Sequence, residues 1–153
     1  SRGGYSVMQL AGTAPERLRA VVAVAGHPFG YRMGPEELAA FVAARNRRSA
    51  HHFGEPGGPP SFPAWSAEKE EAIFRRWALS ELGLVERIAM PVLMINGARD
   101  HLAPIGNIHF MLGSGPVGTR TARIYPEAGH CAFEHSRDWV PASFAWLARE
   151  LAR

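Results

Sequence analysis

Apolar residues along this chain gather in three compact runs, and the stretches between the runs carry the spacing of helices. The runs over 18–25 and 91–96 are mostly apolar, and a glycine directly follows each of them. Such runs are typical of strands that are buried on both faces of a parallel sheet. The run over 121–125 is shorter and stops before a proline. We therefore predict three strands at these positions.

The segments between the runs predict helices or helical turns over 3–10, 35–48, 66–81, 84–88, 105–112 and 139–151. Ser66 is well placed to cap the helix over 66–81, which has acidic residues in its first turn. We expect the buried side of that helix to hold Ile73, Phe74, Trp77 and Leu79. The last segment predicts an amphipathic helix with Val140, Phe144, Trp146, Leu147 and Leu151 as its apolar residues.

Strands that alternate with helices predict an α/β fold, with a mostly parallel sheet flanked by helices. Such sheets usually have more than three strands, so we expect the N-terminal strands of the domain to be missing from this chain. The strand over 18–25 should then have an unpaired apolar edge. Residues 51–64 are dense in glycine and proline, which predicts an irregular loop. We interpret the region of about 31–89 as an insertion that forms a lid or cap.

Composition narrows the function classes. The 153 residues are 46% apolar, which is ordinary for one folded domain. The formal charge is +3, but the arginines are interleaved with acidic residues, so we expect no nucleic-acid partner. No apolar run approaches the roughly 20 residues that span a bilayer, so we expect no membrane association. With Cys131 as the single cysteine, nothing indicates an oxidising compartment, and we predict a cytoplasmic protein. The sequence is compatible with a homo-oligomer.

The candidate chemistry depends on Ser1, Asp100 and His130. Serine is a weak nucleophile and needs a base, a group that orients the base, and donors for the developing oxyanion. Asp100 follows the second predicted strand, and His130 lies in a glycine-marked loop after the third, so both belong at the carboxyl edge of the sheet. These two residues suit the roles of orienting acid and base.

The start of the chain, Ser1-Arg2-Gly3-Gly4-Tyr5, has the pattern of the second half of a G-x-S-x-G nucleophile elbow. Gly3 and Gly4 would allow the close backbone approach that such a turn requires. The backbone N–H of Arg2 is then the first oxyanion donor, because it belongs to the residue after the nucleophile. The leading Gly-x of the motif and a second oxyanion donor are not in this chain, so we expect it to be inactive by itself.

Other side chains have competing interpretations. His27 and Phe29 follow the first strand and are candidates for the substrate pocket, with a structural role about as well supported. Trp65, Phe62 and Phe53 suit either an apolar lid over the site or packing onto the domain. We predict that Cys131 is a small buried thiol, because adjacent side chains such as His130 and Cys131 rarely face each other.

We predict no metal site, because the histidines at positions 51, 52, 101 and 109 have no recognised ligand spacing. Two other acidic residues, Asp138 and Glu127, are available to pair with His130. Neither follows a strand in the way the acid of a triad should, so we prefer Asp100.

Three segments, 84–100, 102–104 and 124–130, resemble the C-terminal part of α/β-hydrolases, and the order Ser1, Asp100, His130 is that of their triad. Within this superfamily the elbow and the last helix, around Trp146, are most similar to the fermentation-respiration-switch esterase-like group, which includes dihydropseudooxynicotine hydrolase. The resemblance implies hydrolysis of esters or of carbon–carbon bonds in small β-diketone-like molecules. It also implies that no metal or organic cofactor takes part.

The leading hypothesis is therefore a serine hydrolase with a Ser-His-Asp triad, acting on a carboxylic ester or an activated ketone. One alternative is a catalytically silent or truncated hydrolase-fold domain with a binding role. A minor alternative is a self-processed hydrolase in which the α-amine of Ser1 serves as the base.

Overall fold

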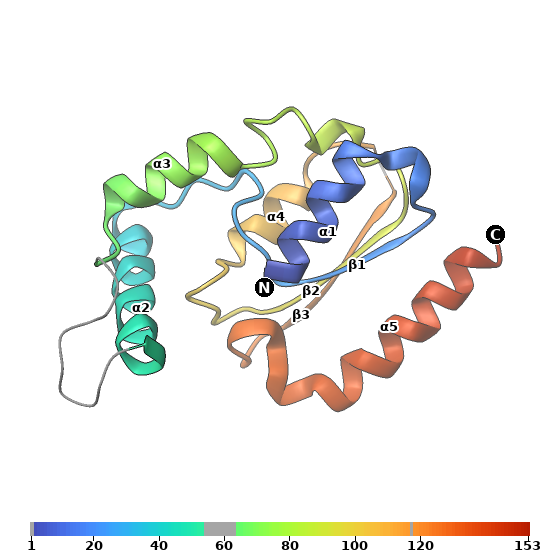
Figure 1. The fold of residues 1–153 in the computed structure, drawn as a ribbon. Coiled ribbons are helices and arrows are strands. Elements are labelled where there is room, and N and C mark those ends of the chain that lie inside the picture. The colour runs from blue at the N-terminus through green and yellow to red at the C-terminus, as the bar shows by residue number, and fades with distance from the viewer. Residues whose placement is uncertain (1, 54–63, 117) are drawn as a thin grey trace.

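The computed structural model describes residues 2–53, 64–116 and 118–153 (Figure 1). Its centre is a three-stranded parallel sheet in the order β1 (Val21–Val24), β2 (Val92–Gly97), β3 (Arg120–Tyr125). Val92 of β2 is in register with Val21 on one side and Arg120 on the other. The three predicted strands are confirmed. Among the described residues β1 pairs with β2 alone, so it forms an edge of the sheet, as expected.

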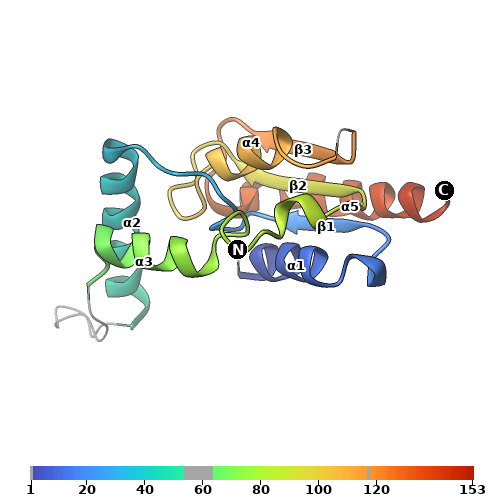
Figure 2. The same cartoon turned by 90° about the horizontal axis from the view of Figure 1, so that it is seen from above.

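Helices cover both faces of the sheet. On one face, α1 (Arg2–Thr13) and α4 (Gly106–Leu112) pack against alternate residues of β1 and β2, including Met94. On the other face, α5 (Ser136–Leu151) packs Trp146 against Leu93 and Ile95 (Figures 1 and 2). The alternation of β2 side chains between these two clusters is the reason for its apolar run from Val92 to Ile95, because a strand buried on both faces has no polar side.

The first turn of α1 lies directly against the end of β1. A Cβ atom at Gly4 would overlap the carbonyl oxygens of Val24 and Ala25, so only glycine fits there. The space around Gly3 is open, so the close approach expected for both glycines belongs to Gly4 alone. A 3-10 turn over Pro15–Arg17 follows α1.

The region expected to be an insertion contains α2 (Pro35–Phe53) and α3 (Ala67–Trp77). The end of α2 extends to Phe53, so the irregular loop predicted from residue 51 begins later than expected. Both helices lie beyond the carboxyl ends of the strands (Figures 1 and 2). A 3-10 turn over Val85–Arg87 then leads the chain back to β2, at the position of the predicted turn.

The helix predicted over 66–81 is shorter than expected. Ser66 caps it as predicted, accepting a hydrogen bond from the backbone N–H of Lys69 at 3.2 Å. The helix ends at Trp77 because Ala78 takes an extended conformation. Trp77 is 43% exposed, so its expected burial is wrong, and the buried residues of α3 are Phe74 and, unexpectedly, Glu70.

The closing helix is present, but most of its predicted apolar side faces solvent. Trp146 is buried and Leu147 is partly buried, whereas three of the predicted residues are exposed: Val140, Phe144 and Leu151. At about 100° per residue these three lie about 120° to 160° away from Trp146 around the helix axis. Within the described residues, no helix is long and apolar enough to cross a membrane.

Candidate active site

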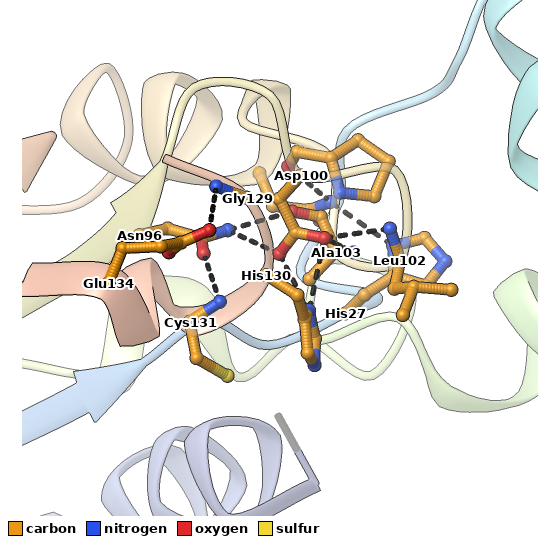
Figure 3. A network of polar contacts seen from close by, with 11 residues as sticks. His27, Asn96, Asp100, Leu102, Ala103, Gly129, His130, Cys131 and Glu134 are labelled. Atoms are coloured by element: carbon orange, nitrogen blue, oxygen red, sulfur yellow. Dashed lines mark hydrogen bonds and ion pairs between the residues drawn. The ribbon is translucent and has the colours of Figure 1, made fainter. Parts of the chain in front are cut away.

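Asp100 and His130 meet at the carboxyl edge of the sheet. Asp100 lies three residues beyond the end of β2, and His130 opens the 3-10 segment His130–His135 that follows β3. The Nδ1 atom of His130 lies 3.0 Å from Oδ1 and 2.9 Å from Oδ2 of Asp100 (Figure 3). The structure therefore brings these two predicted site residues into direct contact. Parallel strands make this contact natural, because the loops that leave their carboxyl ends share one edge.

The carboxylate of Asp100 is fully buried and well supplied with donors. The backbone N–H groups of Leu102 and Ala103 donate to Oδ1 at 2.7 and 3.1 Å, and the side chain of Asn96 donates to Oδ2 at 2.9 Å. Burial by itself would raise the pKa of Asp100. The hydrogen bonds from His130, Leu102 and Asn96 outweigh burial and hold this pKa below its ordinary value.

Asn96 is a site residue that the sequence analysis missed. Its Nδ2 also donates to the carbonyl of Ala103 at 2.9 Å, and its Oδ1 accepts the backbone N–H of Cys131 at 3.0 Å. One buried amide thus joins the loop of Asp100 to the loop of His130. The sequence does contain a signal for Asn96, because a polar side chain inside a buried strand needs hydrogen-bond partners.

The pKa of His130 is shifted in the opposite direction to that of Asp100. The hydrogen bond with Asp100 is the largest cause that raises the pKa of His130 to about 9, and interaction with Cys131 adds to it. Burial opposes the rise, because it disfavours the charged ring. The imidazole is partly shielded, with 16% of its side-chain surface exposed.

Cys131 is buried, as predicted, but its expected separation from His130 is wrong. Burial raises the pKa of the Cys131 thiol, whereas the hydrogen bond and the charge of His130 are among the effects that lower it overall. Both Cys131 and Ala132 have left-handed backbones, with φ of 61° and 46°. This unusual turn departs from a regular helical path and brings two adjacent side chains into interaction.

The loop that carries His130 lies tightly against the end of β2. A Cβ atom at Gly97 would overlap the carbonyl oxygens of Ala128 and Gly129. Farther along, the indole N–H of Trp139 donates to the carbonyl of Ala132 at 2.8 Å. The position of His130 thus depends on backbone packing on one side and on α5 on the other.

The start of α1 belongs to the same neighbourhood. Arg2 is the first residue of α1, and the first turn packs at Gly4 against Ala25. Ala25 in turn packs in one apolar cluster with Cys131. In Figure 3 the ring of His130 extends from Asp100 in the direction of this helix. Ser1, the predicted nucleophile, lies outside the described residues.

Both predicted substrate-binding residues have buried side chains. Phe29 is 1% exposed and belongs to the main apolar cluster, while only 3% of the His27 side chain is exposed. The imidazole of His27 is engaged by Glu70 and Asn107. Their role toward substrate stays a prediction. Of the expected lid aromatics, Trp65 donates from its indole N–H to Glu70 at 3.1 Å, and the side chains of Phe53 and Phe62 lie outside the described part.

The two competing acids have other partners. Asp138 accepts hydrogen bonds from Arg123 and from the hydroxyl of Tyr125, the latter at 2.6 Å. Glu127 forms an ion pair with Arg99. Within the described residues, no group of three potential ligands is arranged to hold a metal ion.

A hollow of about 420 Å³ lies elsewhere, between β2, β3 and α5. Its walls include Leu93, Ile95, Trp139 and Trp146, on the face opposite to α1. Neither Asp100 nor His130 lines it. The hollow is therefore separate from the polar site.

The fold matches solved structures of hydrolases. The monoacylglycerol lipase of Paleococcus ferrophilus aligns with a TM-score of 0.61 and 20% identity, over 98% of this chain and 66% of that chain. The 2,6-dihydroxy-pseudo-oxynicotine hydrolase aligns with a TM-score of 0.60 and 16% identity, over 94% and 36%. Est1E from Butyrivibrio proteoclasticus aligns with a TM-score of 0.58 and 21% identity, over 100% and 60%. No family model and no curated protein matches the chain.

These likenesses confirm the expected fold class: the chain has the α/β-hydrolase fold. It corresponds to a part of that fold, since it spans between 36% and 66% of the length of these three structures.

Proposed function

We propose that this chain supplies the base and the orienting acid of a serine hydrolase, with His130 and Asp100 in these roles. The contact that carries the proposal is the one between Nδ1 of His130 and the buried carboxylate of Asp100, at 2.9 and 3.0 Å. A carboxylate in this position fixes the imidazole so that its Nε2 atom exchanges protons with the nucleophile. The donors around Asp100 support this role, because they keep the acid ionised and immobile.

In the proposed reaction the hydroxyl oxygen of Ser1 attacks the carbonyl carbon of the substrate, and the hydroxyl proton passes to Nε2 of the neutral form of His130, whose share grows as the pH rises toward about 9. The backbone N–H of Arg2 stabilises the oxyanion. When the tetrahedral intermediate collapses, the bond to the leaving group breaks and His130 returns the proton to that group. Water then attacks the acyl group bound to Ser1 and gives a proton to His130. The bond between the acyl carbon and the Ser1 oxygen breaks, His130 returns the proton to that oxygen, and the acid product is released.

The substrate class that we propose is a small carboxylic ester or an activated ketone whose carbon–carbon bond is cleaved. Support comes from the fold neighbours, since a lipase and a pseudo-oxynicotine hydrolase share this architecture. Both kinds of substrate have a carbonyl carbon that an activated serine attacks, so the same three residues serve either.

Labelling with a fluorophosphonate probe tests the proposal, in the longest natural chain that contains this sequence. We expect one labelled serine, and no labelling after Ser1→Ala. Replacing Asp100 by Asn should slow labelling by a factor on the order of 10⁴, because an amide orients the imidazole wrongly. His109→Gln is the matched control, since His109 is exposed on α4 and should not affect the rate. Labelling that survives in the Ser1→Ala or the His130→Ala variant would contradict the proposal.

A further inference from the structure

A second histidine–carboxylate pair lies at the carboxyl edge of the sheet, outside the proposed triad. His27 comes shortly after β1, and Glu70 lies in the first half of α3. The Nε2 atom of His27 is hydrogen-bonded to Oε1 of Glu70, and each side chain is only 3% exposed. The pair therefore joins the sheet to the α2–α3 insertion through a buried polar contact.

The neighbours of His27 determine which ring nitrogen carries the proton. Asn107 accepts the backbone N–H of Phe29 through Oδ1 at 2.8 Å, and its Nδ2 donates to the carbonyl of Pro104 at 3.2 Å. These two contacts fix the orientation of the Asn107 amide, because an N–H only donates and a carbonyl only accepts. Nδ2 of Asn107 then donates to Nδ1 of His27 at 3.1 Å. With Nδ1 as an acceptor, Nε2 of the neutral ring carries the proton that Glu70 accepts.

Glu70 is equally well arranged for this contact. Its second oxygen, Oε2, accepts the indole N–H of Trp65 at 3.1 Å. Burial raises the pKa of Glu70, but the hydrogen bonds from His27 and Trp65 and the charge of Arg45 oppose burial, and the pKa is lowered. The side chain is thus an ionised carboxylate that needs both of its donors, because a buried charge without partners is strongly unfavourable.

The segment between α3 and β2 packs into the main apolar cluster through residues 79, 84, 85 and 88, but the described side chains of α2 and α3 themselves do not. None of the three apolar clusters in the described part of the chain includes a residue from α2 or α3. The two buried aromatic side chains of these helices each have a polar neighbour. The ring of Phe41 lies 5.1 Å from the ring of His27, and the guanidinium of Arg32 lies 4.1 Å above Phe74. A specific polar contact therefore has more influence here than it would in a continuous apolar core.

We propose that Glu70 is a positioning residue, which anchors the α2–α3 insertion over the carboxyl edge of the sheet by accepting the Nε2 proton of His27. Asp100 and His130 lie at the same edge. That the anchored insertion acts as a cap over a catalytic centre rests on the proposed hydrolase function. The anchor itself does not, and it is measurable without any substrate.

Hydrogen–deuterium exchange of this chain tests the anchor. In the Glu70→Gln variant a single oxygen replaces two, so either His27 or Trp65 loses its acceptor. We expect amide exchange within α3 to become about tenfold faster, while exchange in β2 changes less than about twofold. Glu68→Gln is the matched control, because Glu68 is exposed on the same helix. Unchanged exchange in α3, or an equal loss of protection in α3 and β2, would overturn the proposal.

Variants at His27 separate the hydrogen bond from simple packing. Glutamine can place an amide N–H near the position of Nε2, whereas alanine cannot. We expect His27→Gln to keep α3 protected within about twofold of the wild type, and His27→Ala to resemble Glu70→Gln. Ring ¹⁵N shifts of His27 should show a protonated Nε2 and an unprotonated Nδ1. The opposite tautomer, or equal exchange in the two His27 variants, would contradict the anchor.

If the chain belongs to an active hydrolase, loss of the anchor should raise KM for ester substrates more than it lowers kcat, since Glu70 does not touch the reacting atoms. A protein that shows the exchange pattern but no fluorophosphonate labelling would retain the anchor and lose only the proposed function. Fluorophosphonate labelling together with unchanged exchange in the Glu70→Gln variant would support the proposed function and overturn the anchor.

Discussion

Asn96 donates a hydrogen bond from Nδ2 to Oδ2 of Asp100 at 2.9 Å, so the last part of β2 braces the carboxylate that holds His130. Asn96 is 1% exposed and Asp100 is 5% exposed. A buried carboxylate with this supply of donors stays ionised where a carboxylate without them would take up a proton. The support for Asp100 thus comes from the rigid sheet as well as from its own loop.

Replacing Asn96 by Asp keeps the size of the side chain but exchanges the donor for a second carboxylate. We expect the free energy of unfolding near neutral pH to fall by about 3–5 kcal/mol, because two buried carboxylates then face each other. The pKa of the pair should rise, so the loss should shrink as the pH falls and the pair takes up a proton. Urea unfolding at several pH values measures this. A loss that is the same at every pH would contradict the explanation.

The contact between Asp100 and His130 predicts a stability that depends on pH. The pKa of His130 is raised from 6.5 to about 9 in the folded chain. The stabilisation is therefore fully present below about pH 6.5 and is lost as the pH rises through about 9. Its size is on the order of 3 kcal/mol. Unfolding measured between pH 6 and 10 should show this decline in the wild type, and His130→Gln should flatten it. A wild-type profile as flat as that of the variant would refute the ion pair.

The sequence predicted the sheet more accurately than the helices. Strands buried on both faces have few polar residues, and this pattern has no close competitor in so short a run. The apolar residues of α5 did not determine which side of the helix is buried, because Phe144 and Trp146 lie on different sides of it. Which side faces the sheet depends on tertiary packing, and the structure selects Trp146.

The site was predictable for the residues that follow a strand, because their place at the edge of the sheet can be inferred from the sequence. Asp100 and His130 follow strands, so their meeting at one sheet edge could be expected. The buried partnership of His27 and Glu70 joins residues 43 positions apart, and no local pattern indicates such a contact. The interaction of His130 with Cys131 depends on left-handed backbone angles at positions that are not glycine, which a sequence does not indicate.

Arg120 gives a prediction about stability at the other end of the sheet, because it is the first residue of β3 and the site lies at the carboxyl edge. Its guanidinium donates to three carbonyl groups: Met111 at 2.7 Å, Val85 at 2.6 Å, and Ser114. Lysine has one nitrogen and cannot span these acceptors. We expect Arg120→Lys to lower the free energy of unfolding by about 1–3 kcal/mol, measured by urea denaturation. Arg19→Lys is the control, since Arg19 is exposed, and an equal effect of the two substitutions would rule out the three-carbonyl contact.

Gly97 links the packing of β2 to the chemistry of His130. Because a Cβ atom there would overlap the carbonyls of Ala128 and Gly129, Gly97→Ala must push the His130 loop away from the strand. We expect a loss of about 1–3 kcal/mol in the free energy of unfolding, as in other overpacked cores. Displacement of the loop lengthens the contact with Asp100, so the pKa of His130 should also fall from about 9 toward its ordinary value of 6.5.

The matched control is Gly113→Ala, at the end of α4. Gly113 has an ordinary φ of −85°, and a methyl group there would make only ordinary contacts, at 3.6 and 3.8 Å from the carbonyl oxygens of His109 and Phe110. This change should therefore leave stability unchanged or raise it by about 0.5 kcal/mol. An NMR titration of His130 then separates two explanations of any Gly97→Ala defect. A lowered pKa shows that the loop has moved relative to Asp100. A destabilised variant that keeps the raised pKa would show that the strand yielded instead, and that the loop position does not depend on Gly97.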